Sequence, residues 1–287
     1  MKKIRKAVIP VAGFGTRFLP QTKAMPKEMI PVIDKPVIQY IVEEAVNSGI
    51  SEIIFITSGN KRAIEDHFDK SFELDYLLQK KGKTKELKEM RRISNMAKFV
   101  YTRQSEPLGL GHAILCAKNI VGNEPFAVCL GDDIVDNQIP ATKQLIKIYK
   151  KYNSPVVGVF EVPKDQVNKY GIAAPKEKIT DKTILLKDLV EKPEIKNAPS
   201  NLAVGGRYVF TPDIFPILEQ TKPGKGSEIQ LTDAIQTLLK KRKFLAHIYE
   251  GAYHDCGNKL NYLKTVAKFA LRDPKLGPEL KKYIQEL

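Results

Sequence analysis

Short apolar runs alternate with helical patterns through the first half of this sequence, and this order restricts the possible folds. Ala7–Ala12, Glu52–Ser58 and Phe126–Leu130 are apolar runs of strand length, whereas Ile38–Ser48 and Lys61–Phe68 have the apolar spacing of helices. Runs that are apolar throughout indicate strands buried on both faces, as in a parallel sheet covered by helices. The alternation therefore predicts an α/β fold.

The remaining predicted elements continue this alternation to the end of the chain. Further strands are expected at Lys98–Thr102, Val156–Val162, Thr183–Glu191, Val204–Phe210 and Leu245–Glu250. Further helices are expected at Gly109–Lys118, Thr142–Lys151, Asp213–Gln220, Ser227–Leu239, Lys259–Arg272 and Pro278–Leu287. Ser227 and Gln230 have the spacing of a capping box, which predicts a helix start at Ser227. No linker or repeat divides the chain, so we expect one domain over residues 1–287.

A highly charged helical segment lies at about residues 71–96. Leu74, Leu78, Leu87 and Ile93 are among its apolar positions, and Gly82 interrupts it. We interpret it as a helical insertion that packs on the main body or on a partner. With the C-terminal helices at about 259–287, it is a candidate contact surface, and we expect a homodimer or homotetramer.

The composition fits a globular protein that handles anionic small molecules. The 287 residues suffice for a buried core, and no apolar run reaches the roughly 20 residues that span a bilayer. The first apolar run contains Pro10 and continues into a glycine turn, which indicates a strand and not a signal peptide. The net charge is +14, but the lysines are dispersed and seldom alternate with aromatic residues. We therefore expect phosphorylated metabolites as partners, with no nucleic acid and no membrane.

The three cysteines are far apart, and none has the spacing of a zinc site. Cys116 and Cys129 fall in apolar stretches, so we expect them to be buried, reduced thiols. Unpaired thiols are typical of a reducing compartment. A cytoplasmic location is therefore expected.

The segment after the first strand combines glycines with cations. Gly13 and Gly15 flank Phe14, and Arg17 and Lys27 follow within a proline-rich stretch. The segment matches neither the P-loop pattern nor the dinucleotide-binding fingerprint. Free backbone N–H groups in a glycine loop still bind phosphate oxygens, and an arginine adds a bidentate fork. We interpret this loop as the site of a nucleoside triphosphate.

Carboxylates follow two of the predicted strands. Gly131, Asp132 and Asp133 come at the carboxyl end of a buried strand, where α/β proteins bind ligands. Such a carboxylate either forms an ordinary turn or, beside a triphosphate, holds Mg²⁺. Asp255 precedes a predicted helix and is either its N-terminal acid or a second Mg²⁺ ligand, and we interpret the neighbouring His254 as structural.

A Glu191-Lys192 pair ends another strand, just before a proline. One reading is a surface ion pair of little energetic value. The other places Glu191 on sugar hydroxyls and Lys192 on a phosphate. The residues alone leave both readings open.

The loop sequence resembles a known family. GFGTRFLPQTK, residues 13–23, matches the GxGTRxxPxTK signature of the sugar-1-phosphate nucleotidylyltransferases. The following AMPKEM, residues 24–29, is similar to the uridylyltransferase branch and differs from thymidylyltransferases. Residues 71–83, 104–115 and 226–235 resemble the same branch, and the likeness extends from Lys6 to about Lys268.

This resemblance implies a Rossmann-like three-layer fold with a mixed, mostly parallel central sheet. It also implies the following roles. By this resemblance, the nucleotide would be lined by Ala12, Gly13, Gly15 and Thr16. Uracil would be recognised by Gln104, Gly109 and Glu28. Arg17 and Lys27 would hold the triphosphate, and Asp132 with Asp255 would hold Mg²⁺. Glucose contacts are implied for Gly171, Glu191 and Val204, and a contact with the sugar phosphate for Lys192.

The implied reaction is uridylyl transfer from UTP to glucose 1-phosphate, which yields UDP-glucose and pyrophosphate. One alternative is the same chemistry with dTTP, as in a sugar-1-phosphate thymidylyltransferase. An alternative of another class is a non-catalytic, regulatory protein that binds nucleotide sugars. Such a protein would be expected to lose Arg17, Lys27 or Asp132, and this chain has all three.

Overall fold

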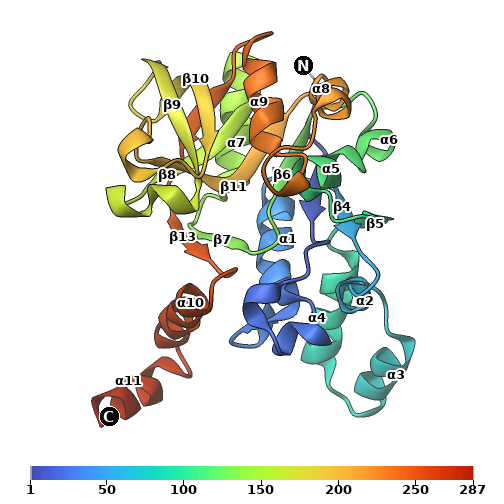
Figure 1. Cartoon of the computed structure of the whole chain (residues 1–287). Helices are drawn as coiled ribbons and strands as arrows, with labels where there is room; N and C mark the ends of the chain where they lie inside the picture. Colours follow the sequence, from blue (N-terminus) through green and yellow to red (C-terminus); the bar gives the residue numbers. More distant parts are fainter. Residues whose placement is uncertain (1, 287) are drawn as a thin grey trace.

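The computed structural model of the chain describes residues 2–286, apart from the side chain of Lys225, and shows a nine-stranded mixed sheet with helices on both faces (Figure 1). In spatial order the strands are β5 (Lys98–Arg103), β4 (Glu52–Thr57), β1 (Lys6–Pro10), β6 (Phe126–Cys129), β11 (Leu202–Phe210), β8 (Val156–Glu161), β12 (Leu245–Ile248), β10 (Thr183–Glu191) and β9 (Gly171–Lys178). The predicted three-layer α/β class is confirmed.

The two halves of the sheet pair differently. From β5 through β4 and β1 to β6, every neighbouring pair is parallel. In the second half only β12 and β8 are parallel, whereas β11 is antiparallel to β6 and β8, and β10 to β9 and β12. The expected predominance of parallel strands therefore holds for the N-terminal half alone, because all but one of the neighbouring pairs from β6 to β9 in the spatial order are antiparallel.

The helices bury the two faces of the sheet in separate clusters. Val8 and Ile9 are neighbours in β1 and are both fully buried, yet they belong to opposite clusters because successive strand side chains point to opposite faces. This explains why the strand sequences are apolar throughout. One face is covered by α1 (Val37–Asn47), α2 (Arg62–Phe68) and α7 (Ala141–Tyr152), and the other by α5 (Gly109–Leu115), α6 (Lys118–Val121), α8 (Ile214–Gln220) and α9 (Leu231–Leu239).

Two helical pairs extend beyond the sheet, although Ile93 in the first of them still belongs to a core cluster. The predicted charged segment forms α3 (Phe72–Lys80) and α4 (Thr84–Asn95), separated at Gly82, whose φ is +66°. At the end of the chain, α10 (Lys259–Arg272) and α11 (Gly277–Gln285) form an arm that points away from the sheet (Figure 1). The prediction that the last helix reaches Leu287 concerns a position outside the described residues. In residues 2–286, no helix has the length and apolarity that a bilayer crossing requires.

Two predictions about local structure are wrong. Helix α9 begins at Leu231, because Ser227 has a φ of +59° and belongs to a preceding loop. That loop is held extended by tertiary pairing, in which Ile229 donates to Leu108 O and accepts from the N–H of Gly111. Cys129 is buried as expected, but Cys116 is only half-buried.

The sequence patterns also missed several short strands. β7 (Asp133–Asp136) and β13 (Ala252–Asp255) form an antiparallel pair beside the main sheet, and β2 (Pro31–Val32) and β3 (Lys35–Pro36) form a hairpin. The first pair matters for function, because it joins the loop after β6 to the segment before α10. Asp255 and Asp133 are directly paired in it.

Candidate active site

The loop after β1 is folded tightly against Lys27. Gly15 has a φ of +67°, and a Cβ on it would lie 3.1 Å from Lys27 Cβ and 3.2 Å from Thr22 Cγ2. Thr22 Oγ1 donates a 2.8 Å hydrogen bond to the carbonyl oxygen of Gly15. A residue with a side chain would be strained and crowded there. The glycine therefore lets the loop approach Lys27.

Lys27 forms an ion pair with Asp132, the residue that follows the strand β6 and its Leu130-Gly131 extension. The Lys27 Nζ and Asp132 Oδ2 atoms are 2.5 Å apart, and each side chain is 23% exposed. Burial alone would lower the pKa of Lys27, but the charges of Asp132 and Glu28 outweigh it and raise this pKa. For Asp132, burial is outweighed by the Lys27 charge, and its pKa is lowered. Both groups are therefore charged at neutral pH.

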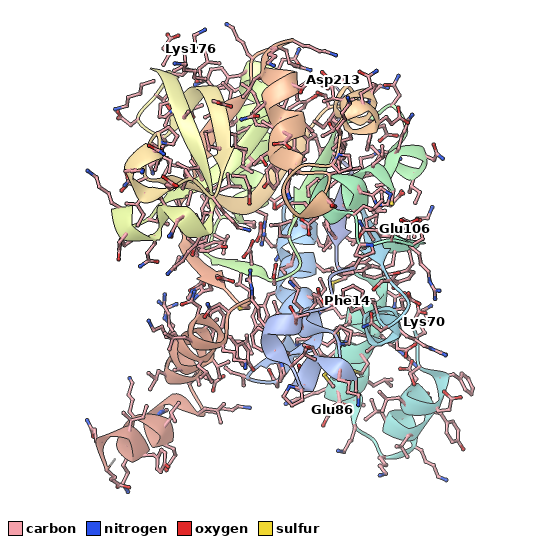
Figure 2. The ribbon with its side chains drawn as sticks, in the orientation of Figure 1. Phe14, Lys70, Glu86, Glu106, Lys176 and Asp213 are labelled. Carbon is pink, nitrogen blue, oxygen red and sulfur yellow. The ribbon has the colours of Figure 1, made fainter. Side chains whose placement is uncertain are left out.

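A cleft of about 400 Å³ opens beside this pair. It collects all seven residues predicted for the nucleotide, together with Lys27 and Asp132: Ala12, Gly13, Gly15, Thr16, Glu28, Gln104 and Gly109. Phe14, 59% exposed, also lines it and is labelled in Figure 2. The sequence separation of these residues is large, but parallel strands bring their carboxyl ends to one edge of the sheet.

Glu28 is anchored from behind by a residue that the sequence did not single out. Lys61 Nζ donates to Glu28 Oε2 at 2.9 Å, and both side chains are 1% exposed. Burial raises the pKa of Glu28, although Lys61 and Lys27 oppose this effect. The pair fixes the floor of the cleft.

The far end of the cleft is formed by Gln104 and the start of α5. Gln104 Nε2 donates to the carbonyl oxygen of Gly109 at 3.0 Å. Gly109 has a φ of +90°, and a Cβ there would lie 2.7 Å from Glu228 Cβ. Only glycine fits this crossing of α5 and the loop before α9.

Asp132 and Asp255 converge on one small space beside Gly257. A Cβ on Gly257 would lie 2.6 Å from Asp132 Oδ2 and 3.2 Å from Asp255 Oδ1. The alternative role of Asp255 as helix N-cap is wrong, because Asn258 Oδ1 accepts from the N–H groups of Leu260 and Asn261. Asp255 faces Asp132 across Gly257, and its Oδ1 accepts from the N–H of Gly257 at 2.9 Å while its Oδ2 accepts from Asn261 Nδ2 at 3.4 Å.

Arg17 approaches this space from the glycine loop. Its Nη1 lies 3.5 Å from the carbonyl oxygen of Gly257, and its charge helps to lower the pKa of Asp132. Arg17 does not line the 400 Å³ cleft itself. It stands at the junction between the cleft and the two carboxylates.

Asp133 is held differently from its neighbour. Its Oδ1 accepts a 2.6 Å hydrogen bond from the hydroxyl of Tyr253, and its carbonyl oxygen accepts one from Arg207, also at 2.6 Å. Burial and then the charge of Asp132 raise the pKa of Asp133 to about 7. Asp133 thus belongs to the support of the site, a role that the sequence did not reveal.

The predicted sugar contacts meet on the antiparallel half of the sheet. Glu191 pairs with Gly171 across β10 and β9. A Cβ on Gly171 would lie 3.3 Å from Glu191 Oε2 and 3.6 Å from both Val204 Cγ2 and Thr232 Cγ2. The Thr232 hydroxyl is buried and has no hydrogen-bond partner within residues 2–286. Thr232 is thus a further residue of this group that sequence reasoning missed.

Lys192 joins this group through the backbone. Its φ is +43°, and its N–H donates to the carbonyl oxygen of Tyr170 at 3.0 Å. Its Nζ lies 3.5 Å from Glu191 Oε1, and half of the side chain is exposed. The pair is therefore weak as an ion pair and leaves the ammonium available.

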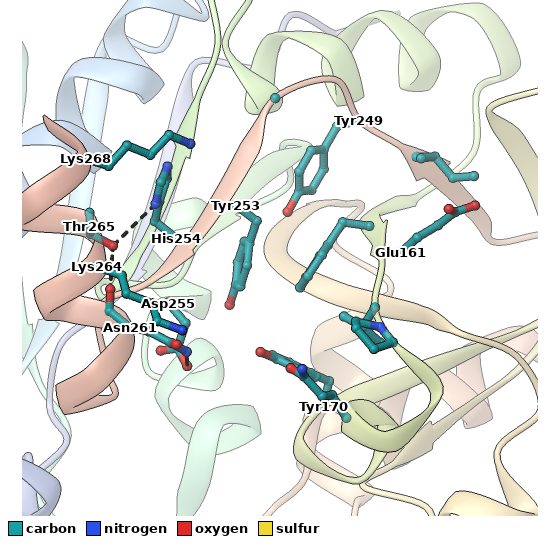
Figure 3. A pocket seen from close by; sticks show the side chains of 16 residues that line it. Glu161, Tyr170, Tyr249, Tyr253, His254, Asp255, Asn261, Lys264, Thr265 and Lys268 are labelled. Atoms are coloured by element: carbon teal, nitrogen blue, oxygen red, sulfur yellow. Dashed lines mark hydrogen bonds between the residues drawn. The ribbon is translucent and has the colours of Figure 1, made fainter. Parts of the chain in front are cut away.

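A second cavity, of about 600 Å³, lies between the sheet and α10 (Figure 3). Tyr170, Tyr253 and Asp255 line it together with Asn261 and Lys264 of α10. Burial, followed by the charges of Asp255 and Asp133, raises the pKa of Tyr170. Asp255 therefore lines this cavity and also shares with Asp132 the space beside Gly257.

Comparison with known proteins decides the family. The sequence model of the family described as nucleotidyl transferase matches residues 6–271. This chain is a member of the nucleotidyl transferase family. The match spans β1 to α10 and so contains every residue placed in the site above.

Relatives of this nucleotidyl transferase agree over its full length. It is 52% identical over 287 residues to the UTP–glucose-1-phosphate uridylyltransferase of Bacillus subtilis, covering 100% of this chain and 98% of the relative. It is similar to a UTP-bound UGPase from Acinetobacter baumannii, with a TM-score of 0.92, 44% identity and coverage of 99% and 100%. It is also similar to a UDP-glucose pyrophosphorylase complexed with UDP-glucose, with a TM-score of 0.87, 44% identity and coverage of 94% and 100%.

Proposed function

We propose that this nucleotidyl transferase moves the uridylyl group of UTP to glucose 1-phosphate, with release of pyrophosphate. The observation that carries the proposal is the 52% identity, over the whole chain, to a UTP–glucose-1-phosphate uridylyltransferase. The two similar structures are named for UTP and for UDP-glucose, the substrate and the product of this reaction. The clustering of the expected residues around the cleft supports it independently.

The cleft is proposed as the UTP site. Ala12, Gly13, Gly15 and Thr16 would present backbone N–H groups to phosphate oxygens, because the two glycines have no side chain to cover the backbone. Gln104 and Gly109, with Glu28 below, would recognise uracil. Arg17 and Lys27 would hold the phosphates, since both are cations at the junction of the cleft with Asp132.

The two carboxylates beside Gly257 fit a divalent cation. Mg²⁺ in triphosphate sites is usually held by one or two carboxylates, with the remaining ligands from phosphates and water. Asp132 and Asp255 supply two, and the missing Cβ of Gly257 leaves the space between them open. Within residues 2–286 no third histidine, cysteine or carboxylate completes the set. When bound, Mg²⁺ would neutralise charge on the phosphate oxygens.

The group around Gly171 is proposed as the glucose site. Glu191 would accept hydrogen bonds from sugar hydroxyls, while Gly171 and Val204 leave room for the ring. Lys192, next to Glu191, would bind the phosphate of glucose 1-phosphate.

The reaction requires positioning more than chemical activation. An oxygen of the sugar phosphate attacks the α-phosphorus of UTP, and the bond from that phosphorus to the oxygen bridging to the β-phosphate breaks in line. The attacking group is already an anion, so no enzyme nucleophile or general base is needed. The task of Arg17, Lys27 and Lys192 is to hold two anions together and to stabilise the charge that develops.

Two further properties belong to the same proposal. We take the chain as one nucleotidyltransferase domain with α3 and α4 as an insertion, working in the cytoplasm as a homodimer or homotetramer. Exposed apolar side chains on α3 and on the C-terminal arm, such as Phe72, Leu263 and Tyr283, support an interface there. Light scattering that finds only monomers at micromolar concentration would contradict the assembly.

The decisive test is pyrophosphate release with UTP, dTTP, ATP or GTP, each with glucose 1-phosphate and with Mg²⁺ or EDTA. Release with UTP that EDTA abolishes is the expected result. A preference for dTTP would favour the thymidylyltransferase alternative. No release with any nucleotide, in protein that still binds UTP, would favour the non-catalytic alternative.

A further inference from the structure

His112 of α5 lies beside the Gln104 side chain at the base end of the cleft. Gln104 Nε2 is 3.0 Å from the Gly109 carbonyl oxygen and 3.0 Å from His112 Nδ1. A carbonyl oxygen only accepts hydrogen bonds, so the amide atom that faces it must be the nitrogen. The partner thereby fixes which way the amide of Gln104 points.

The same nitrogen fixes the tautomer of His112. An amide NH₂ group carries two protons and only donates, so His112 Nδ1 must accept. The ring is therefore neutral, with its proton on Nε2. One amide proton of Gln104 goes to Gly109 and the other to His112, so both are used.

Gln104 Oε1 is the one polar atom of this side chain that is left. Within residues 2–286 it forms no hydrogen bond. Solvent reaches it, so it differs from the buried polar atoms that have no partner. Since Gln104 lines the cleft, Oε1 is presented to the ligand as an acceptor.

We propose that His112 contributes to base specificity by helping the Gly109 carbonyl to hold the Gln104 amide in this orientation. The inference rests on the proposed function, in which Gln104 reads the base. Uracil presents a donor at N3–H, whereas cytosine has an acceptor at N3, so Oε1 attracts the first and repels the second. A half-turn of the amide would present Nε2 and favour cytosine. The turn would lose the hydrogen bond to the Gly109 carbonyl oxygen and would require the His112 proton to move from Nε2 to Nδ1, so both partners oppose it.

The test compares UTP and CTP in two variants of similar size. His112→Leu removes the acceptor, whereas His112→Asn keeps one near the position of Nδ1. We expect the ratio of kcat/KM for UTP to that for CTP to fall about five- to tenfold in His112→Leu, the effect of one lost hydrogen bond. In His112→Asn the ratio stays within about twofold of wild type. A packing defect alone would lower both rates and leave the ratio unchanged, which would overturn the proposal.

Coupling to Gln104 is tested in a double-mutant cycle. In a Gln104→Ala background, His112→Leu should no longer change the UTP-to-CTP ratio, because the amide that it orients is absent. The same change in both backgrounds would show that His112 acts by another route and would overturn the proposal.

A direct readout does not depend on a variant. The chain has four histidines, so ¹⁵N NMR of histidine-labelled protein, assigned with His112→Asn, can report the protonation of each ring nitrogen. We expect an unprotonated Nδ1 and a protonated Nε2 at His112 in the free protein, and a proton on Nδ1 would overturn the inference. Failure of the proposed function is recognised separately, as wild-type protein that does not turn over UTP or does not prefer it to CTP.

Discussion

Two ion pairs reach the Asp132–Asp133 segment from opposite sides. Lys27 binds Asp132 at the wall of the cleft, where both side chains are 23% exposed. Arg207 binds Glu44 in the core, where the exposed fractions are 1% and 8%, and also donates to the Asp133 carbonyl oxygen. Neighbouring residues of one segment thus contact two ion pairs, one partly exposed to solvent and one buried.

The difference lies in what remains to be satisfied. Arg207 also donates to the backbone carbonyl oxygens of Gly206 and Asp133. Glu44 also accepts hydrogen bonds from the N–H and the hydroxyl of Thr142. Lys27 and Asp132 have one bond to each other and solvent beside it. A fully satisfied buried pair fixes structure, whereas a half-open pair can exchange its partner for a ligand.

Breaking the core pair should have the largest effect. Glu44→Gln leaves the Arg207 charge buried without its counter-ion, and we expect a loss of about 3–5 kcal/mol in the free energy of unfolding. Urea titration at fixed protein concentration measures it. The double variant Glu44→Met/Arg207→Met should recover part of the loss, because no charge is left in the core. A loss below about 1 kcal/mol in Glu44→Gln would show that the pair does not stabilise the fold.

Opening the cleft pair should affect activity more than stability. Lys27→Ala and Arg17→Ala should each lower kcat about 10²-fold or more, as expected for groups that stabilise developing charge. The free energy of unfolding should change less than in Glu44→Gln, because Arg17 is exposed and the Lys27–Asp132 pair is partly solvated. Steady-state kinetics and urea titration of the same preparations make the comparison. Wild-type kcat/KM in Arg17→Ala would remove that residue from the proposed machinery.

Filling the space between the carboxylates should weaken the binding of Mg²⁺. A Cβ in Gly257→Ala would lie 2.6 Å from Asp132 Oδ2, so one carboxylate must move. We expect the Mg²⁺ concentration for half-maximal rate to rise about tenfold or more, as for other disturbed ligand spheres. Gly59→Ala is the matched control, since a Cβ there meets nothing within 4 Å. Equal Mg²⁺ titrations for the two variants would refute the proposed site.

The core pair also predicts a pH effect with a definite sign. Burial would raise the pKa of Glu44, but Arg207 outweighs it, so the folded-state pKa lies below the ordinary 4.5. This contribution to stability is complete above pH 4.5 and is lost as the pH falls through the folded pKa. The gap between wild type and Glu44→Gln should therefore narrow below that pH, by at most about 1.4 kcal/mol per pH unit. Urea titrations from pH 7 to pH 3 measure this difference in the free energy of unfolding. A difference that grows as the pH falls would refute the prediction.

An exposed pair should matter least. Lys118 and Glu219 are 2.6 Å apart, but their side chains are 43% and 45% exposed. Lys118→Met should change the free energy of unfolding by less than about 0.5 kcal/mol and leave kcat unchanged. Many other charged side chains are exposed in the same way, since nitrogen-tipped side chains lie along the outline of the molecule in Figure 2. A larger effect would mean that exposure is a poor guide to these pairs.

Local sequence determined the elements and the nucleotide end of the site. Most of the buried strands and helices were predicted because hydrophobic period and glycine turns act over a few residues, but strand β9 was not. The sequence also allowed us to predict two parts of the site: the glycine loop with Arg17 and Lys27, and Asp132 after β6. Each of them lies within one short segment at the end of a strand. Their convergence then follows from parallel pairing.

Tertiary structure alone decided the rest. The helix start at Leu231 was misplaced because pairing of Ile229 with Leu108 overrides the local capping signal. The meeting of Asp255 with Asp132 depends on the β7–β13 pair, and the tautomer of His112 on which nitrogen of Gln104 faces Gly109. Each of these features depends on contacts between segments that are far apart in the sequence. Strand register and burial bring those segments together, and no local sequence pattern encodes them.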